Sequence, residues 1–475
     1  MRGSAKVFVI TGLTFVALLL MYYLPVMSVG GTQLRQVDVL ADLDPDNTER
    51  YDADSITIDE VKKPKGAWKD SVPEGVEPII DYGTDSTGGM DSFYAALAQG
   101  KKLGRPVRVA YLSDSFVEGD IMLVDLRSML QKHFGNGGLG WMRCRTNFDE
   151  GTFAANLSSS GFEPRHIMKA RSLSLAHYIL PQGYSEVHGT ATATVASLSG
   201  EQSTTWSRAT VWGYTDLGAT VTGNPTGATV QWRPHKGIQQ ARFHAANMRR
   251  FSTTVKGDAK VFGMSLENDY GIVVDNFGVR GSSGLQLASL AVGLSADFAR
   301  QHPYDLVIIH YGLNAIAQAG TEKTCSWYVA NMKKCVARIR KIYPRSAVMI
   351  VSASDMATRS HSTGKVCTMP AVETLVRYQQ KMAAEMGVGF INFYDMMGGR
   401  NSVVSMAEHH LAEKDYVHVN RQGGKMMAEK FTKSFVAGYD NYKRKKAAGY
   451  KRYGSDIQQF SATAHLRPSK PYHFQ

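Results

Sequence analysis

Two separated parts of the chain alternate short apolar runs with stretches of helical periodicity. Five runs, VRVAYL, GIVVDNFGV, DLVIIHYG, AVMIVSAS and GVGFINFY, occupy residues 107–112, 271–279, 305–312, 347–354 and 387–394. Helical patterns follow them, among others in residues 118–135, 282–301, 327–344 and 369–387. Nearly continuous apolar strands that alternate with helices predict a parallel sheet covered on both faces. With right-handed crossovers, the pattern predicts an α/β fold with a doubly wound sheet of five parallel strands.

The segment between the first and second runs has a different pattern. About 150 residues separate these runs, far more than a crossover connection needs. Residues 152–268 are rich in Thr, Ser and Gly, contain alternating pieces such as TATATVASL and ATVQWRP, and show few helix signals. They predict an inserted β-sandwich domain. Trp206, Trp212 and Trp232 lie within it, and they either pack in its core or form an aromatic platform that binds sugar rings.

The N-terminal residues predict export from the cytoplasm. Residues 1–6 carry two positive charges, and no charged residue follows from Val7 until Arg35. About 20 apolar residues span a bilayer, and the preceding positive charge keeps the N-terminus cytoplasmic. Residues 1–30 therefore predict an uncleaved signal anchor, a transmembrane helix, with a cleaved signal peptide as the alternative. Residues 31–90, rich in Asp, Pro, Thr and Gly, are typical of a spacer.

The chain carries a net charge of +12, and part of this excess lies near its C-terminal end. An apolar content of 43% and a charged content of 20% exclude a largely disordered chain. Residues 443–470 contain eight basic residues and one acidic residue. Such a run is compatible with nucleic acid, anionic lipid head groups or an acidic polymer as a partner, and equally with a merely solvated extension. Residues 441–475 form the predicted basic tail.

Export permits a disulfide among the four cysteines, which are Cys144, Cys325, Cys335 and Cys367. Cys325 and Cys335 lie on one predicted helix, about 15 Å apart, which is too far for a bond. Cys367 lies in a loop after a later strand, within reach of the start of that helix. The sequence therefore predicts a Cys325–Cys367 disulfide, with Cys144 and Cys335 buried as thiols.

Candidate catalytic residues lie at the ends of the predicted core elements. Ser115 follows the first strand, Gly281 the second and Asn314 the third, while Asp415 and His418 precede the last helix. A serine nucleophile needs a base and a group that orients the base, and Asp-x-x-His brings a carboxylate and an imidazole together. The backbone N–H groups of Ser115 and Gly281 and the side-chain amide of Asn314 are expected to form an oxyanion hole. Each residue alone has a structural alternative: Ser115, for example, is also a suitable helix cap.

Four short motifs, in chain order, resemble those of the SGNH hydrolases, also called GDSL esterases. SDSFVEGD resembles their Gly-Asp-Ser block with Ser113 in place of glycine, and GVRG resembles their second block at Gly281. GLNA resembles their Gly-x-Asn-Asp block with Ala315 in place of aspartate, and DYVH matches their Asp-x-x-His block. The resemblance implies a hydrolase domain with the flavodoxin-like SGNH fold in residues 91–151 and 269–440, interrupted by the β insert.

The resemblance also implies a chemistry. Ser115 is the implied nucleophile, His418 the base and Asp415 the group that orients it, with no metal or other cofactor. The reaction is acyl transfer through an acyl-serine. An exported SGNH domain interrupted by a β domain is similar to bacterial peptidoglycan O-acetylesterases, whose insert resembles a carbohydrate-binding module. The first prediction is therefore a periplasmic, membrane-tethered O-acetylesterase that acts on peptidoglycan or another envelope polysaccharide.

Two other functions are carried as alternatives. If a sugar hydroxyl takes the acyl group instead of water, the protein is an O-acetyltransferase partnered with a membrane-bound O-acyltransferase. If Ser115 does not react, the protein is an inactive glycan-binding protein. The expected partners are an acetylated glycan and, through the N-terminal helix, the inner membrane, and no nucleic acid is expected. If the signal is cleaved, the protein is secreted.

Overall fold

The computed structural model describes residues 28–29, 32–33, 68–83, 89–145, 152–169, 176–200, 203–317, 320–360 and 364–449. The chain divides into two units, Met1–Ile56 and Thr57–Gln475. In the first unit, β1 (Ser28–Val29) and β2 (Thr32–Gln33) pair in antiparallel. The predicted anchor up to residue 27, most of the spacer and the tail beyond Gly449 lie outside the described residues. None of the described helices is both long and apolar enough to cross a bilayer.

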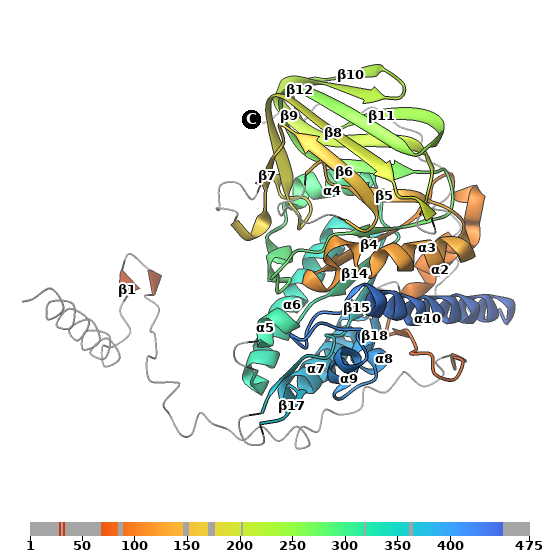
Figure 1. The fold of residues 1–475 in the computed structure, drawn as a ribbon, viewed down its shortest axis with the longest axis vertical. Coiled ribbons are helices and arrows are strands. Elements are labelled where there is room, and N and C mark those ends of the chain that lie inside the picture. The colour runs from red at the N-terminus through yellow and green to blue at the C-terminus, as the bar shows by residue number, and fades with distance from the viewer. Residues whose placement is uncertain are drawn as a thin grey trace, which may run out of the picture. The chain divides into compact units, whose positions relative to one another are not determined.

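The second unit is built on a six-stranded sheet (Figure 1). Its order is β13 (Ile272–Asn276), β4 (Val107–Ser113), β14 (Leu306–His310), β15 (Ala347–Val351), β18 (Gly389–Ile391) and β3 (Ile80–Asp81). The first five are parallel, and each lies in one of the five predicted apolar runs. The prediction of an α/β fold with a parallel sheet is confirmed. The sequence did not predict β3, which pairs in antiparallel with β18 and comes from the segment expected to be a spacer.

Helices cover both faces of this sheet (Figure 1). One face packs against α2 (Met90–Gln99), α3 (Leu123–Phe134), α8 (Phe393–Met397), α9 (Ser402–Glu408) and α10 (Arg421–Ala447). The other packs against α4 (Val292–Gln301), α5 (Leu313–Ile316), α6 (Glu322–Ile342) and α7 (Pro370–Met386). Short 3-10 helices span Gly100–Leu103, Ser115–Asp120, Ile167–Lys169 and Leu285–Ser289, and β16 (Ala357–Arg359) pairs with β17 (Val366–Thr368). This arrangement leaves the carboxyl ends of the parallel strands free for a site.

The insert is a single antiparallel sheet, so the two-sheet β-sandwich predicted for it is not confirmed. The strands of this sheet are β5 (Gly138–Met142), which precedes the insert, and, within the insert, β6 (Ala155–Ser160), β7 (Glu163–Arg165), β8 (Tyr184–Ser197), β9 (Trp206–Asn224), β10 (Ala228–Trp232), β11 (His235–Met248) and β12 (Arg250–Glu267). β9 and β12 are long enough to change partners along their length: β9 pairs with β11 and then β10, and β12 pairs with β8 and then β5. Register shifts between β9 and β12 locally disrupt the ladder, as β-bulges do.

Of the two alternatives for the three tryptophans of the insert, core packing is confirmed, and the aromatic platform for sugar rings is wrong. Trp206, Trp212 and Trp232 are each no more than 2% exposed. Trp212 donates its indole N–H to Ser265 Oγ at 3.0 Å, and its ring meets Phe298 of α4 edge to face. These rings pack in hydrophobic clusters. The sequence did not show this, because alternation along a strand places every second side chain on one face but does not say which face is covered.

The predicted Cys325–Cys367 disulfide is also wrong, because all four cysteines are free thiols in the structure. Cys325 is buried on α6, and its thiol donates to the carbonyl oxygen of Ala371 on α7 at 3.7 Å. Cys367 lies on β17, in the small hairpin with β16. Cys144 and Cys335 are buried thiols, as expected. Burial raises the pKa of Cys144 to about 12, so this thiol stays protonated at neutral pH.

A buried ion pair joins the insert to the α/β core. Arg108 of β4 donates to both carboxylate oxygens of Glu267 of β12, at 2.5 and 2.7 Å, and Arg208 of β9 donates to the same carboxylate at 3.1 Å. Burial alone raises the pKa of Glu267, but the charge and hydrogen bonds of Arg108 lower it to about 2. Because this value lies below the ordinary 4.5, the pair stabilises the fold above about pH 4.5 and loses this contribution as the pH falls through about 2.

Replacement of Glu267 by alanine is expected to lower the free energy of unfolding by about 3–5 kcal/mol, because it leaves Arg108 buried without its partner. Urea unfolding followed by circular dichroism measures this change. Arg165→Ala is the matched control, since it breaks the exposed pair between Arg165 and Glu186 on the same sheet and should cost about 1 kcal/mol or less. Similar losses in both variants would contradict the prediction.

Candidate active site

The turn after β4 presents Ser115 at the carboxyl end of the sheet. β4 ends at Ser113, whose buried hydroxyl donates to the carbonyl oxygen of His310 at 2.8 Å. The 3-10 helix Ser115–Asp120 begins next, and its cap is Asp114, whose carboxylate accepts the N–H of Phe116 at 3.0 Å. The hydroxyl of Ser115 is therefore not used as a helix cap, which removes the structural alternative for this residue.

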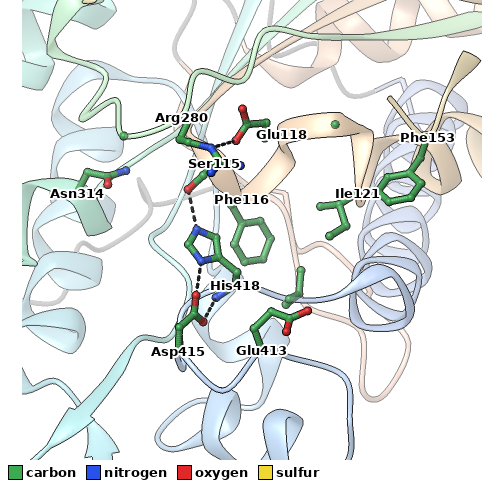
Figure 2. Close-up of a pocket in the computed structure, with 13 residues that line it drawn as sticks. Ser115, Phe116, Glu118, Ile121, Phe153, Arg280, Asn314, Glu413, Asp415 and His418 are labelled. Carbon is green, nitrogen blue, oxygen red and sulfur yellow. Dashed lines mark hydrogen bonds and ion pairs between the residues drawn. The ribbon is translucent and has the colours of Figure 1, made fainter. Parts of the chain in front are cut away.

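The loop between α9 and α10 brings Asp415 and His418 to this turn (Figure 2). One carboxylate oxygen of Asp415 accepts the N–H groups of Val417 and His418, each at 3.0 Å, which closes a tight turn. The other lies 2.7 Å from Nδ1 of His418, and Nε2 of the same ring lies 2.8 Å from Oγ of Ser115. The structure thus brings together the three residues that the sequence analysis selected, from positions 303 residues apart.

The protonation of the hydrogen-bonded series Ser115, His418 and Asp415 follows from the charge of Asp415. Partial burial raises the pKa of Asp415, but hydrogen bonds from the His418 ring and from two backbone N–H groups outweigh it and lower the pKa below its ordinary value. Asp415 is therefore ionised at neutral pH, and a carboxylate only accepts hydrogen bonds. Nδ1 of His418 then carries the ring proton, which leaves Nε2 as the acceptor for the hydroxyl of Ser115.

The expected oxyanion-hole residues line one pocket with Ser115. Gly281 lies in a turn with φ of +71°, a conformation that side chains other than glycine rarely adopt. Within the described part of the chain, the N–H groups of Ser115 and Gly281 donate to no backbone carbonyl of a turn or loop. Asn314 differs, because its amide donates to Asp114 at 3.0 Å and to the carbonyl oxygen of Ser282 at 3.1 Å. Both of its N–H bonds are used in this structure, so its role as an oxyanion donor requires that one of them be exchanged.

Two buried titratable groups lie beside the nucleophile turn. Burial raises the pKa of Asp114 to about 6, although hydrogen bonds from Phe116 and Asn314 and the nearby His418 lower it. Burial lowers the pKa of His310 to about 3, so its ring is neutral, and its Nδ1 lies 3.0 Å from the hydroxyl of Tyr111. His310 also packs against Phe116, which follows Ser115. At neutral pH the ring of His310 is therefore uncharged, whereas Asp114 is mostly ionised.

The pocket has a volume of about 760 Å³, within the range of sites for small molecules and sugars. Besides the expected residues, its lining includes Phe153, Arg280, Glu118 and Glu413, which the sequence analysis missed. Arg280 donates to Glu118 at 2.6 Å, and Figure 2 shows this pair beside Ser115. No motif includes Phe153 or Glu413. Arg280 directly precedes Gly281, and this was the one sequence signal that it lies in the pocket. The lining carries more carboxylates than cations, in contrast to the chain as a whole.

The described residues contain no group of three or more His, Cys, Asp or Glu side chains arranged to hold a metal ion. The groups that converge in the pocket are a hydroxyl, an imidazole and a carboxylate in one hydrogen-bonded chain, with backbone N–H groups alongside. This arrangement is suited to nucleophilic attack on a carbonyl carbon by Ser115.

Part of the chain matches a family model. Residues 246–426 match the model of the GDSL-like lipase/acylhydrolase family. This segment is therefore similar in sequence to a GDSL-like acylhydrolase domain. The match includes Gly281, Asn314, Asp415 and His418 but begins beyond Ser115, because the insert separates the nucleophile turn from the rest of the domain.

One of the solved structures that match the chain has a similar fold. The chain is similar to a peptidoglycan O-acetylesterase with a TM-score of 0.61 and 21% identity, over 76% of this chain and 99% of that chain. A family two carbohydrate esterase from Cellvibrio japonicus matches at a TM-score of 0.27 and 9% identity, over 60% of this chain and 99% of that chain. A GDSL-like lipase from Parabacteroides merdae matches at 0.27 and 16%, over 35% and 73%. No curated protein matches the chain.

Proposed function

We propose that the protein is a serine esterase that removes O-acetyl groups from peptidoglycan or another envelope polysaccharide. The observation that carries the esterase chemistry is the hydrogen-bonded chain from Ser115 through His418 to Asp415, at 2.8 and 2.7 Å. These distances suit a nucleophile, a general base and an orienting carboxylate. Ser115 and Gly281 line the same pocket. The carbonyl carbon of an ester can therefore lie against the hydroxyl of Ser115 while its oxygen lies against the N–H group of Gly281.

The reaction follows from this geometry. His418 Nε2 takes the proton of Ser115 as its oxygen attacks the acetyl carbonyl, and the ionised Asp415 stabilises the imidazolium that forms. The backbone N–H groups of Ser115 and Gly281 are the proposed donors to the oxyanion. The sugar hydroxyl then leaves with the proton from Nε2, and an acetyl-serine remains. Water gives a proton to the same nitrogen as it attacks this ester, and acetate leaves while Ser115 recovers its proton.

The choice of substrate rests on the overall plan of the chain. The fold matches that of a peptidoglycan O-acetylesterase over 76% of this chain and 99% of that chain. The charge-free stretch from Val7 to residue 34 supports a membrane-tethered protein in the periplasm, where it meets the acetylated glycans of the envelope. The carboxylates Glu118 and Glu413 of the pocket do not attract an anionic glycan, so such attraction is expected of the basic tail instead.

The purified protein is expected to hydrolyse p-nitrophenyl acetate and to release acetate from O-acetylated peptidoglycan faster than the uncatalysed background. Liquid chromatography measures the released acetate. Addition of chitopentaose, with p-nitrophenyl acetate as donor, tests the alternative function of a transferase, and mass spectrometry detects an acetylated product. Transfer to chitopentaose without release of acetate would replace the esterase by an O-acetyltransferase working with a membrane-bound acyl donor. Binding of glycan without either reaction would indicate a glycan-binding protein.

A further inference from the structure

Phe153 is an exposed aromatic side chain in the active-site pocket. It belongs to the first residues of the insert, and 47% of it is exposed to solvent. Among the described residues, five large hydrophobic side chains are at least 39% exposed. Of these five, Phe153 is the one that lines the pocket with Ser115. Figure 2 shows its ring beyond Ile121, on the side of Ser115 opposite to Asn314 in this view.

Polar contacts fix Phe153 to the nucleophile turn. Its backbone N–H donates to the carbonyl oxygen of Gly119 at 2.8 Å. The hydroxyl of Thr152 donates to the carboxylate of Asp120 at 2.7 Å, and it accepts the N–H of Ala154 at 3.1 Å. Asp120 is buried and has a φ of +65°, a backbone conformation that costs a residue other than glycine energy. The insert is therefore joined to the turn that carries Ser115 by the side chain of Thr152 and by the backbone of Phe153.

The ring itself is supported from one direction. The guanidinium of Arg421 lies over it, with 5.7 Å between Cζ and the ring centroid, and Arg421 is held in turn by Asp125. Arg421 opens α10, three residues after His418. An aromatic ring that is held by its backbone and by a cation, yet left exposed in a pocket, offers a flat apolar surface to a ligand.

We propose that Phe153 stacks against a pyranose ring of the acetylated glycan and thereby determines the specificity of the site for carbohydrate esters. The face of an aromatic ring carries negative potential and attracts the weakly positive C–H groups of a sugar ring. The pocket of about 760 Å³ has room for a sugar ring at Phe153 and an acetyl group at Ser115. The insert thus contributes to the site through its first residues and not through its buried tryptophans. This inference rests on the proposed esterase function and specifies how its substrate is held.

The test compares an ester on a sugar with an ester that has none. Phe153→Ala and Phe153→Leu are expected to raise KM for chitobiose octaacetate about tenfold. Both should leave kcat/KM for p-nitrophenyl acetate within about twofold of the wild type, while Phe153→Tyr restores the flat ring and the wild-type KM. Trp327→Ala is the matched control, because this side chain on α6 is 58% exposed and does not line the pocket. Trp327→Ala should leave KM for chitobiose octaacetate and kcat/KM for p-nitrophenyl acetate unchanged.

A binding measurement separates this inference from the proposed reaction. In a Ser115→Ala background, isothermal titration with chitobiose should show an affinity about tenfold weaker with Phe153→Ala than without it. The stacking role is overturned if Phe153→Leu retains the wild-type KM for the disaccharide ester, or if each variant loses activity equally on both substrates. If the wild-type protein is inactive but still binds chitobiose through Phe153, the esterase function is overturned and the stacking role stands. If the protein is an active esterase whose kinetics do not depend on Phe153, the stacking role is overturned and the esterase function stands.

Discussion

Replacement of Ser115 by alanine is expected to reduce the hydrolysis of p-nitrophenyl acetate by about 10³-fold or more. The hydroxyl that lies 2.8 Å from Nε2 of His418 is the group that the proposed mechanism acylates, and no other serine in the pocket lining takes its place. The melting temperature should stay unchanged, because Asp114 caps the helix that begins at Ser115. The release of p-nitrophenol, followed spectrophotometrically, measures the rate.

Ser113→Ala is the control for this variant. Ser113 is the last residue of β4, two residues before the nucleophile, and its buried hydroxyl donates to the carbonyl oxygen of His310. Its loss is expected to cost about 1 kcal/mol of stability without a comparable loss of rate. If Ser115→Ala kept more than a tenth of the wild-type activity at an unchanged melting temperature, another residue would have to be the nucleophile.

The features of the fold that were predicted from the sequence are those that depend on local patterns. Each parallel strand is an almost uninterrupted apolar run, and burial on both faces of the sheet requires that composition. β3 was missed because it has only two residues, Ile80 and Asp81, and depends on pairing with β18 for its existence. The single sheet of the insert was missed because the partner changes along β9 and β12 are not marked by any residue pattern.

The candidate site divides in the same way. Asp415 and His418 lie within one turn, so their hydrogen bond is a local property that the Asp-x-x-His spacing predicts. The hydrogen bond between Asn314 and Asp114 joins loops 200 residues apart, and no sequence pattern near either residue predicts it. Phe153 is one of two phenylalanines in a polar stretch, and nothing in the sequence distinguishes it from a core residue. Its importance appears only once the insert is seen to begin at the nucleophile turn.

The tryptophans and the cysteines show why residue type is a weaker guide than contact. Tryptophan binds sugars in many sites, yet Trp206 is fully buried, because a large apolar ring also contributes most when it is removed from water. Cys325 lies close to α7, and its thiol meets the carbonyl oxygen of Ala371 and not Cys367. Disulfide geometry demands close approach of specific atoms, which helix and strand boundaries alone do not determine.

Replacement of Asp415 by asparagine is expected to reduce kcat for p-nitrophenyl acetate by about 10²-fold or more while the fold is retained. An amide at this position donates a hydrogen bond to Nδ1 through its NH₂ group, which favours the tautomer with the proton on Nε2 and prevents that atom from accepting the proton of Ser115. The effect should be smaller than for a fully buried carboxylate, since the side chain of Asp415 is 48% exposed and water replaces part of its charge stabilisation.

Two comparisons give this prediction its force. Glu413→Gln removes a carboxylate from the same loop and the same pocket without touching the His418 ring, so it should change kcat by no more than about twofold. The double variant Ser115→Ala/Asp415→Asn should be no slower than Ser115→Ala alone, because groups that act as one unit do not contribute additively. Multiplication of the two losses would mean that Asp415 serves the reaction independently of Ser115, and that the hydrogen-bonded chain between them is not the catalytic unit.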